Sequence, residues 1–155
     1  MISNKGFTLI ELLVVVLIIG ILAAISLPQY QVTAGKSRIT PLVSILRSID
    51  TAQQVYKMAN GVYASNLTDL DVQIPAADAN FSYSQYIDGN GNVQSISGYD
   101  QRTNVRIGKY YTDDYFICWA YPQSAKYTLQ KRICQVVSGS TQAYPVSGNE
   151  YYIIK

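Results

Sequence analysis

Histidine is absent from this chain of 155 residues, and only two cysteines, Cys118 and Cys134, are present. A tetrahedral zinc site needs four ligands, so two thiols without His could form one only if subunits shared it. A catalytic centre needs a nucleophile, a base and a group that orients the base. The chain has no His for these roles, and its carboxylates are scattered. We therefore expect no enzyme activity, no metal site and no cofactor.

Charged residues are also scarce. Asp, Glu, Lys and Arg together make up 14% of the chain, and the formal net charge is +2. The basic pairs, such as Lys36 with Arg38 and Lys131 with Arg132, are typical of a solvated surface and form no long basic block. A nucleic-acid partner usually requires a clustered basic footprint. No nucleic-acid partner is predicted.

One short segment alternates oxygen-bearing side chains as a calcium loop does. Asp88, Asn90 and Asn92 have the right spacing for ligands. However, Val93 stands where such a loop needs glycine, and Tyr99 stands where it needs a bidentate Glu. The Asp-Gly and Asn-Gly pairs in the same segment favour positive φ. We therefore predict a hairpin turn.

The most unusual segment has almost no charge. Between Phe7 and Leu27 the only ionisable residue is Glu11. As a helix this run would span roughly 30 Å, enough to cross the hydrocarbon layer of a membrane. No soluble domain of this size could bury such a run, so it must lie in lipid or in a shared protein core. A carboxylate there costs on the order of 2–3 kcal/mol, and we expect Glu11 to find a partner outside its own helix.

The residues at the start of this run resemble a known family. Lys5-Gly6-Phe7-Thr8-Leu9-Ile10-Glu11-Leu12-Leu13 is similar to the cleavage and methylation site of type IV prepilins. The resemblance continues through Gly20-Ile21-Leu22-Ala23-Ala24-Ile25, Pro28-Gln29-Tyr30 and Pro41. It covers the first third of the chain strongly and the remainder in outline. A secretory signal peptide, the alternative, would need a small-residue cleavage site after the run. A generic signal anchor would not require the motif before it.

The resemblance implies a maturation route and a division of the chain. Residues 1–6 would be a leader, cut by a prepilin peptidase between Gly6 and Phe7, and the new amino group of Phe7 would be methylated. Residues 7–28 would form a membrane helix that later becomes the polymerisation helix. Residues 29–155 would form the amphipathic half of that helix and a globular head. Glu11, Phe7 and Pro28 would serve subunit assembly, with the Glu11 carboxylate facing the Phe7 amine of a neighbouring subunit.

The implied function is that of a structural subunit of a type IV pilus. Its partners would be other pilin subunits, the pilus assembly machinery and, before assembly, the inner membrane with the head outside the cytoplasm. The filament would serve adhesion, motility or DNA uptake. Two alternatives remain, namely a pseudopilin of a type II secretion system and a membrane-tethered binding head that never polymerises. The cysteine pair near the C-terminus favours the pilus.

The remaining sequence predicts an α+β fold, with one long helix packed on a small antiparallel sheet. Apolar residues recur every three or four positions after Gln29, which indicates one buried helix face. These are Ile39, Leu42, Leu46, Ile49, Ala52, Tyr56 and Ala59. Pro28 and Pro41, with Gly35 between them, predict a bent or locally melted helix. Asn60-Gly61 predicts its end.

Alternation and β-branched or aromatic residues predict strands in the head. The expected ranges are 81–87, 93–97, 102–107, 115–121 and 151–154. Ser124 is expected to open a short helix that ends before Gly139, and a β-hairpin is the competing interpretation. In an exported chain Cys118 and Cys134 are expected to form a disulfide that clips this helix to the sheet edge, whereas free thiols would suit a cytosolic protein. The loop between them resembles the disulfide-bounded region of many pilins.

Overall fold

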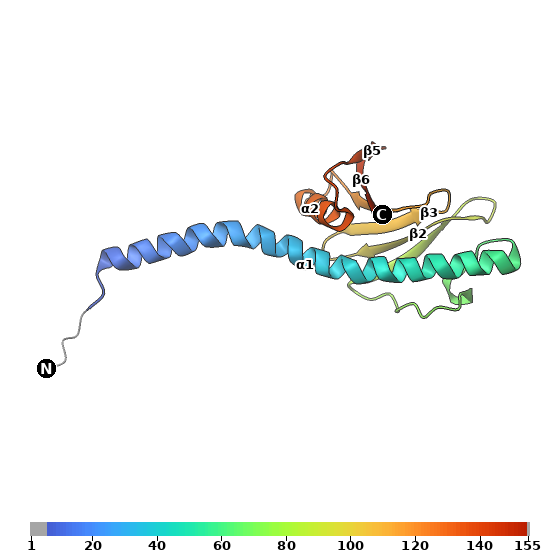
Figure 1. Cartoon of the computed structure of the whole chain (residues 1–155), viewed down its shortest axis with the longest axis horizontal. Coiled ribbons are helices and arrows are strands. Elements are labelled where there is room, and N and C mark those ends of the chain that lie inside the picture. The colour runs from blue at the N-terminus through green and yellow to red at the C-terminus, as the bar shows by residue number, and fades with distance from the viewer. Residues whose placement is uncertain (1–5, 155) are drawn as a thin grey trace.

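A computed structural model of the chain describes residues 6–154. Residues 1–5, which make up most of the predicted leader, therefore lie outside the described residues. Helix α1 (Leu9–Asn60) is a single helix of 52 residues whose first half extends away from the head (Figure 1). It ends at Gly61, where φ is 79° and the N–H donates to the Lys57 carbonyl over 2.8 Å. The predicted stop at Asn60-Gly61 is confirmed.

The two prolines lie inside α1 without breaking it. Pro28 and Pro41 each remove one backbone donor, yet the helix is continuous across both. Figure 1 shows a gentle curve along its length. A bend is therefore confirmed, while local melting, the stronger form of the prediction, is wrong. The second half keeps its helical form because its apolar face is packed, and packing contributes more than propensity.

Six strands form one antiparallel sheet in the order β1-β2-β3-β4-β6-β5. They are β1 (Phe81–Ile87), β2 (Val93–Asp100), β3 (Val105–Tyr110), β4 (Phe116–Ala120), β5 (Tyr144–Val146) and β6 (Asn149–Ile154). The expected α+β fold, a long helix on a small antiparallel sheet, is confirmed. The predicted turn between β1 and β2 is also confirmed, with the Asp88 N–H donating to the Asn92 carbonyl over 2.9 Å.

Several strand boundaries differ from the predictions, and one strand was not predicted. β2 continues to Asp100 rather than ending at residue 97. β3 begins at Val105 rather than 102, because residues 101–104 form a turn in which Asn104 has a φ of 58°. The short edge strand β5 was not predicted, since it has only three residues and one of them, Pro145, has no backbone donor.

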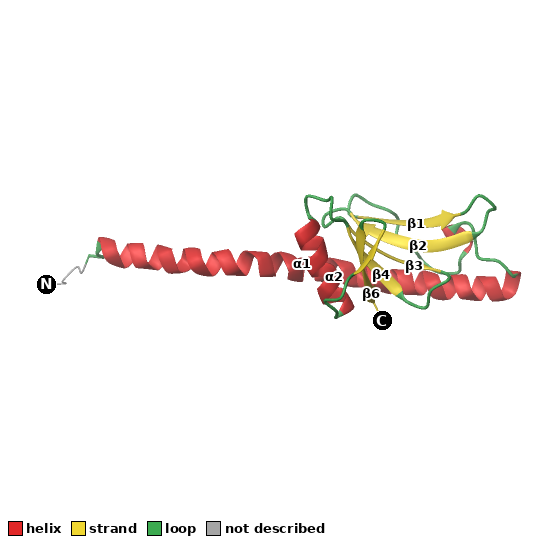
Figure 2. Ribbon diagram, turned by 90° about the horizontal axis from the view of Figure 1, so that it is seen from above, coloured by secondary structure: helices red, strands yellow, loops and turns green. Residues whose placement is uncertain are grey.

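Two helices cover one face of the sheet. The second half of α1 packs on β2 and β3, and α2 (Tyr127–Ser138) packs on β4 and β6. Figure 2 shows α2 crossing α1 where α1 reaches the head. The β-hairpin alternative for this segment is wrong. The helix starts three residues after Ser124, which instead accepts a hydrogen bond from the Lys126 N–H over 3.2 Å in the preceding turn.

The core lies between these helices and the sheet. Four of the predicted stripe residues, Ile39, Leu42, Leu46 and Ile49, are fully buried, and Ile96, Ile107 and Tyr152 meet them from the sheet side. Ala59 is exposed, because α1 extends beyond the sheet there. The loop after α1 returns along the head through the short 3₁₀ helix η1 (Leu67–Asp69). Leu67 and Leu70 attach it to the core.

Candidate assembly surface

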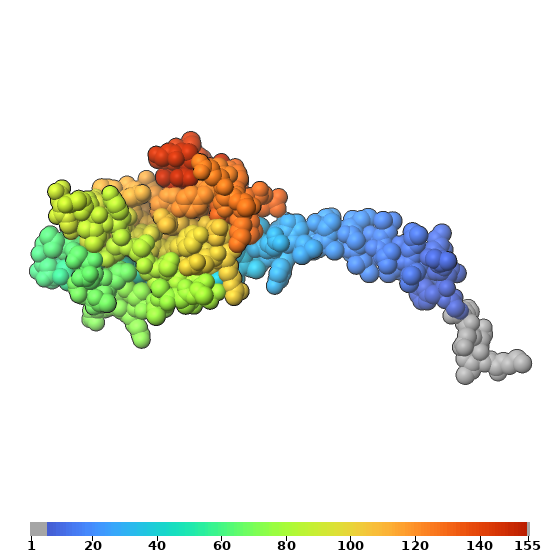
Figure 3. Space-filling model, turned by 180° about the vertical axis from the view of Figure 1, so that it is seen from behind, coloured from blue at the N-terminus to red at the C-terminus, as the bar shows by residue number. Residues whose placement is uncertain are grey.

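The first half of α1 exposes a continuous apolar surface. Its large apolar side chains between Phe7 and Leu27 are exposed by fractions that run from 44% at Val14 to 86% at Leu9. Figure 3 shows this half projecting from the head, and on the face seen there no other described segment covers it. By length and composition it could cross a membrane. Exposed apolar patches beyond a few hundred Å² mark interaction sites in soluble proteins. We call the residues Phe7 to Leu27 the apolar segment.

Glu11 has a partner within its own chain. The Thr8 N–H and hydroxyl donate to Glu11 Oε2 over 2.8 and 2.7 Å, and the Glu11 N–H donates to Thr8 Oγ1 over 3.3 Å. These reciprocal bonds are a capping box, which satisfies orphan backbone donors at a helix start. Thr8 lies just before the first helical residue, Leu9, so the cap gives Glu11 a hydrogen-bond partner within the chain, and the expected partner from a neighbouring subunit stays a prediction. The Glu11 side chain thus helps to cap the helix that begins at Leu9.

A close approach between α1 and α2 joins the apolar segment to the head. Gly35 is buried, and a Cβ built on it would lie 2.8 Å from Ile133 Cγ1 and closer still to Ile133 Cδ1. Pro28, one of the predicted assembly residues, borders the same crossing beside Leu129. The sequence suggested that Gly35 loosens α1. The structure shows instead that Gly35 makes room for α2.

An ion pair fixes the same region of α1 to the sheet. Arg38 Nη2 lies 2.6 Å from Asp100 Oδ1 at the end of β2, and the Thr103 hydroxyl donates to Asp100 Oδ2 over 2.5 Å. Burial raises the pKa of Asp100, but the hydrogen bonds from Arg38 and Thr103 outweigh it, so the pKa lies below its usual value. The hydrogen bond to Asp100 also raises the pKa of Arg38. The head is thus oriented on the helix by charge as well as by packing.

The family model for type IV pilin-like G and H proteins matches residues 43–151, which is most of the chain. The chain belongs to the type IV pilin-like family. A second model, for the prokaryotic N-terminal methylation motif, matches residues 1–27. Together the two models cover the apolar segment and the head. The resemblance drawn from the first third of the sequence is therefore confirmed, and the α+β architecture is that of the pilin fold.

Several curated proteins are similar to this pilin-like chain. A fimbrial protein of Pseudomonas aeruginosa is 42% identical over 92 residues, or 59% of this chain and 58% of the relative. The type IV major pilin protein PilE1 of Neisseria gonorrhoeae is 33% identical over 104 residues, or 67% and 63%. The type II secretion system core protein G of P. aeruginosa is 36% identical over 78 residues, or 50% and 55%. The chain thus spans about 58% of the first relative's length. No solved structure matches it.

The pilin head contains the expected disulfide. Cys118 of β4 is bonded to Cys134 of α2. The prediction that the bridge clips α2 to the sheet edge is wrong, because β4 lies between β3 and β6 in the interior of the sheet. Both cysteines are fully buried. The bond therefore ties α2, the helix that meets α1 at Gly35, to the centre of the sheet.

Two buried glutamines, neither of which was predicted from the sequence, hold loops of the pilin head in place. The Gln53 amide exchanges hydrogen bonds with the backbone of Ala64, over 2.9 Å to the carbonyl and 2.8 Å from the N–H. Gln130 accepts from the Tyr121 N–H over 3.0 Å and donates to the Asn104 carbonyl over 2.9 Å. Each amide pairs with backbone groups that would otherwise be buried unsatisfied. The only available signal was a Gln at an apolar position of each helix stripe.

Proposed function

We propose that this chain is the structural subunit of a type IV pilus, which polymerises through the apolar segment. Residues 1–6 are the leader, residues 7–28 anchor the chain in the inner membrane and then pack in the filament core, and residues 29–155 form the rest of the helix and the head. The head lies outside the cytoplasm. Partners are other copies of the chain, a prepilin peptidase and the assembly machinery. No catalytic role is proposed.

The observation that carries this proposal is the exposure of the apolar segment. Burying one large aliphatic side chain stabilises by about 1.5–3 kcal/mol, and none of these side chains is buried by the chain's own described residues. Such a surface needs either lipid or other helices of the same kind. The match to the methylation motif, over residues 1–27, supports a route in which the segment first lies in lipid and then packs against other helices of the same kind.

Cleavage between Gly6 and Phe7 would create a new charge at the start of the helix. The methylated amine of Phe7 is a cation, and a buried cation is costly unless it is paired. Glu11 supplies the only carboxylate in the apolar segment. We therefore assign Glu11 of one subunit and the Phe7 amine of a neighbour as partners in the filament core, with Pro28 at the end of the packed segment.

The test is the intact mass of the subunit in fibres sheared from cells that express the chain. We expect a subunit that begins at Phe7 and carries one added methyl. Gly6→Leu should abolish processing, because a peptidase that cuts beside Phe7 needs a small residue there. Gly89→Leu is the matched control, since neither Gly6 nor Gly89 has a neighbour within 4 Å of an added Cβ. Fibre subunits that begin at Met1 would refute the maturation route.

A pseudopilin of a type II secretion system is the second candidate, and one observation supports it. The type II secretion system core protein G of P. aeruginosa is among the similar proteins. A pseudopilin would share the apolar segment and its processing but would build only a short periplasmic assembly. Long surface fibres that contain this chain in cells lacking type II secretion genes would exclude that alternative. The same fibres would exclude a tethered head that never polymerises.

A further inference from the structure

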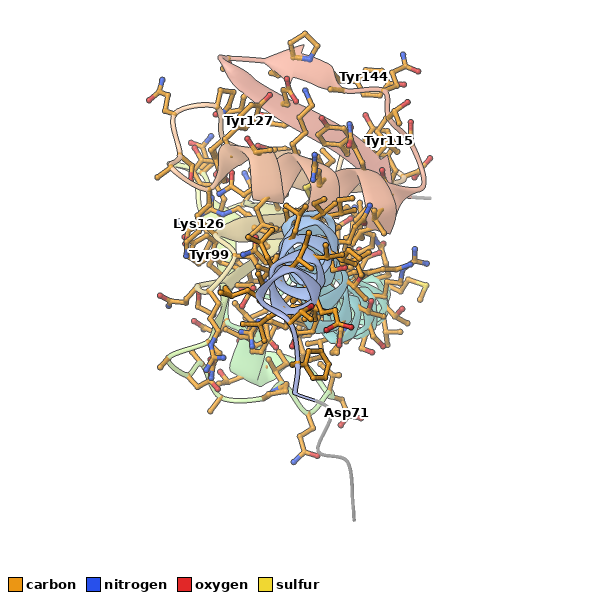
Figure 4. All side chains as sticks on the ribbon, turned by 90° about the vertical axis from the view of Figure 1, so that its left-hand side faces the viewer. Asp71, Tyr99, Tyr115, Lys126, Tyr127 and Tyr144 are labelled. Carbon is orange, nitrogen blue, oxygen red and sulfur yellow. A yellow bond between two sulfur atoms is a disulfide. The ribbon has the colours of Figure 1, made fainter. Side chains whose placement is uncertain are left out.

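A basic groove lies at the end of the head from which the apolar segment emerges. Its floor is formed by Pro28 and Val32 of α1, and its far wall is formed by the first turns of α2. Lys126 and Arg132, both exposed, contribute the charged groups that line it. In Figure 4, which looks at the head from the N-terminal side of α1, Lys126 lies beside α1 below α2. We call this site the junction groove.

Two further cations lie next to the junction groove. The Lys126 Nζ donates to the Arg102 carbonyl over 2.5 Å, which places Arg102 at its edge. Lys36 follows Val32 by one turn of α1, next to Gly35, where α2 crosses. Within residues 6–154, none of these four cations has a carboxylate partner in an ion pair.

The neighbouring carboxylates are already engaged elsewhere. Asp100 is buried against Arg38 and Thr103. Asp78 accepts hydrogen bonds from the backbone N–H groups of Asn80 and Phe81 over 2.7 and 2.6 Å. Asp78 keeps its negative charge, but the basic residues at this end of the head, Lys36, Arg38, Arg102, Lys126 and Arg132, outnumber the two carboxylates, so the net charge here is positive. Charge complementarity calls for an anionic ligand.

The height of the groove above the apolar segment identifies that ligand. Pro28 and Val32 lie one and five residues beyond Leu27, which is at most about 7.5 Å along the helix. The headgroup layer on each side of a bilayer is about 5–8 Å thick. When the apolar segment spans the hydrocarbon, the junction groove is therefore level with the phosphates. Lys36 lies about 14 Å from Leu27, within a Debye length of the headgroup surface.

We propose that the junction groove binds the headgroups of anionic phospholipids while the chain is still in the membrane. This inference rests on the membrane stage of the proposed function. Positive charge next to a membrane helix normally favours the cytoplasmic side, and Lys36, nine residues beyond Leu27 on the exported side, opposes the expected topology. Attraction to anionic lipid gives this cation a role that offsets the disadvantage. The contact holds the head against the membrane and must be released when the subunit enters a filament.

The test uses the full chain reconstituted in lipid nanodiscs with equal amounts of phosphatidylglycerol and phosphatidylcholine. Lipids that stay bound after extraction into a mild detergent are counted by native mass spectrometry. The wild type should retain phosphatidylglycerol over phosphatidylcholine. Each basic side chain near an anionic surface contributes about fivefold to the preference. Removing two of them in Lys126→Gln/Arg132→Gln should therefore lower the preference by roughly thirtyfold. Lys126→Glu/Arg132→Glu should reverse it.

The control is Arg47→Gln/Lys57→Gln, which also removes two positive charges, but from positions farther along α1. These residues lie 20 and 30 residues beyond Leu27, about 30 and 45 Å from the membrane edge, so the preference should be unchanged. Protection of the apolar segment from protease in the nanodisc checks the membrane stage separately. A protected wild-type chain without lipid preference would overturn the inference and leave the proposed function standing. An unprotected segment would overturn both.

One other occupant has a distinct signature. If an acidic surface of a second copy fills the junction groove, the wild type should show no lipid preference and the Lys126→Gln/Arg132→Gln variant should yield fewer fibres. That result would overturn the lipid assignment. A preference lost equally in the control and in the junction variant would also overturn it, because it would reflect overall charge. Near-ultraviolet circular dichroism of each variant verifies that the head is folded.

Discussion

The close approach at Gly35 can be tested by adding one methyl group. In Gly35→Ala the new Cβ would lie 2.8 Å from Ile133 Cγ1 and nearer to Ile133 Cδ1, both fully buried in the α1–α2 contact. Real Cβ atoms are not found so close to a neighbour, so either the Ile133 side chain or one of the two helices must shift. The disulfide between Cys118 and Cys134 ties α2 to the sheet and limits how far it can move.

The magnitude follows from two opposing effects. Overpacking a well-packed core costs about 1–3 kcal/mol, and replacing a glycine by alanine inside a helix contributes about 1 kcal/mol. Gly35→Ala should therefore lower the free energy of unfolding by about 0–2 kcal/mol in the wild-type background. Ile133→Ala removes both opposing atoms, at a cost of about 2–5 kcal/mol by itself. In that background, Gly35→Ala should instead stabilise by about 1 kcal/mol.

The assay is guanidinium unfolding of the full chain in mild detergent, followed by the fluorescence of Trp119. Trp119 is the only tryptophan and lies on β4, so it reports on the head rather than on the apolar segment. The double-mutant cycle should give a coupling energy of about 1–3 kcal/mol. A Gly35→Ala substitution that is equally stabilising in both backgrounds would show that α1 and α2 do not meet there.

Three further predictions concern other contacts. Cys134→Ser should destabilise the head by about 3 kcal/mol while α1 stays helical. Trp119 fluorescence would report on the head and far-ultraviolet circular dichroism on the helix. Equal loss of both signals would contradict this prediction. Folding lowers the pKa of Asp100, so the stabilisation that Asp100 contributes is complete above its ordinary pKa and is lost as the pH falls through its lowered pKa. Asp100→Asn should therefore flatten the acid side of the plot of stability against pH, below about pH 4. An unchanged slope would contradict this prediction. Glu11→Gln should leave cleavage and methylation intact but reduce sheared fibres strongly, and Glu11→Ala should do at least as much; normal fibre yield from either processed variant would refute charge pairing.

Periodicity and turn chemistry were sufficient to predict much of the fold. The stripe that contains Ile39 and Leu42 identified the buried face of α1, because a helix of this length must bury one side. The glycine at position 61 identified its end, since a left-handed C-cap favours glycine. The Asp88 turn fixed the first hairpin, whose strand β1 matches its predicted range. Each of these signals lies within a few residues of the feature that it specifies.

Features that depend on contacts between distant residues could not be predicted. Gly35 looked like a helix-loosening residue because its neighbour Ile133 is far away in the sequence. The roles of Gln53 and Gln130 have no local signal, since the backbone groups that they satisfy belong to loops placed only by the fold. The groove beside Lys126 was likewise hidden, because its basic residues come from both helices and a turn of the sheet.

Glu11 shows how one side chain can serve both the single chain and the proposed filament. Both hydrogen bonds from Thr8 go to Oε2, and Oε1 accepts none from residues 6–154. The free oxygen is exposed at the start of the apolar segment, so a cationic amine from a neighbouring subunit could reach it without disturbing the cap. A carboxylate can accept several hydrogen bonds, and a charge-assisted one is stronger than a neutral one. Glutamine would preserve the local cap through its amide oxygen but would lack the charge, and this is why the Glu11→Gln variant separates helix initiation from assembly.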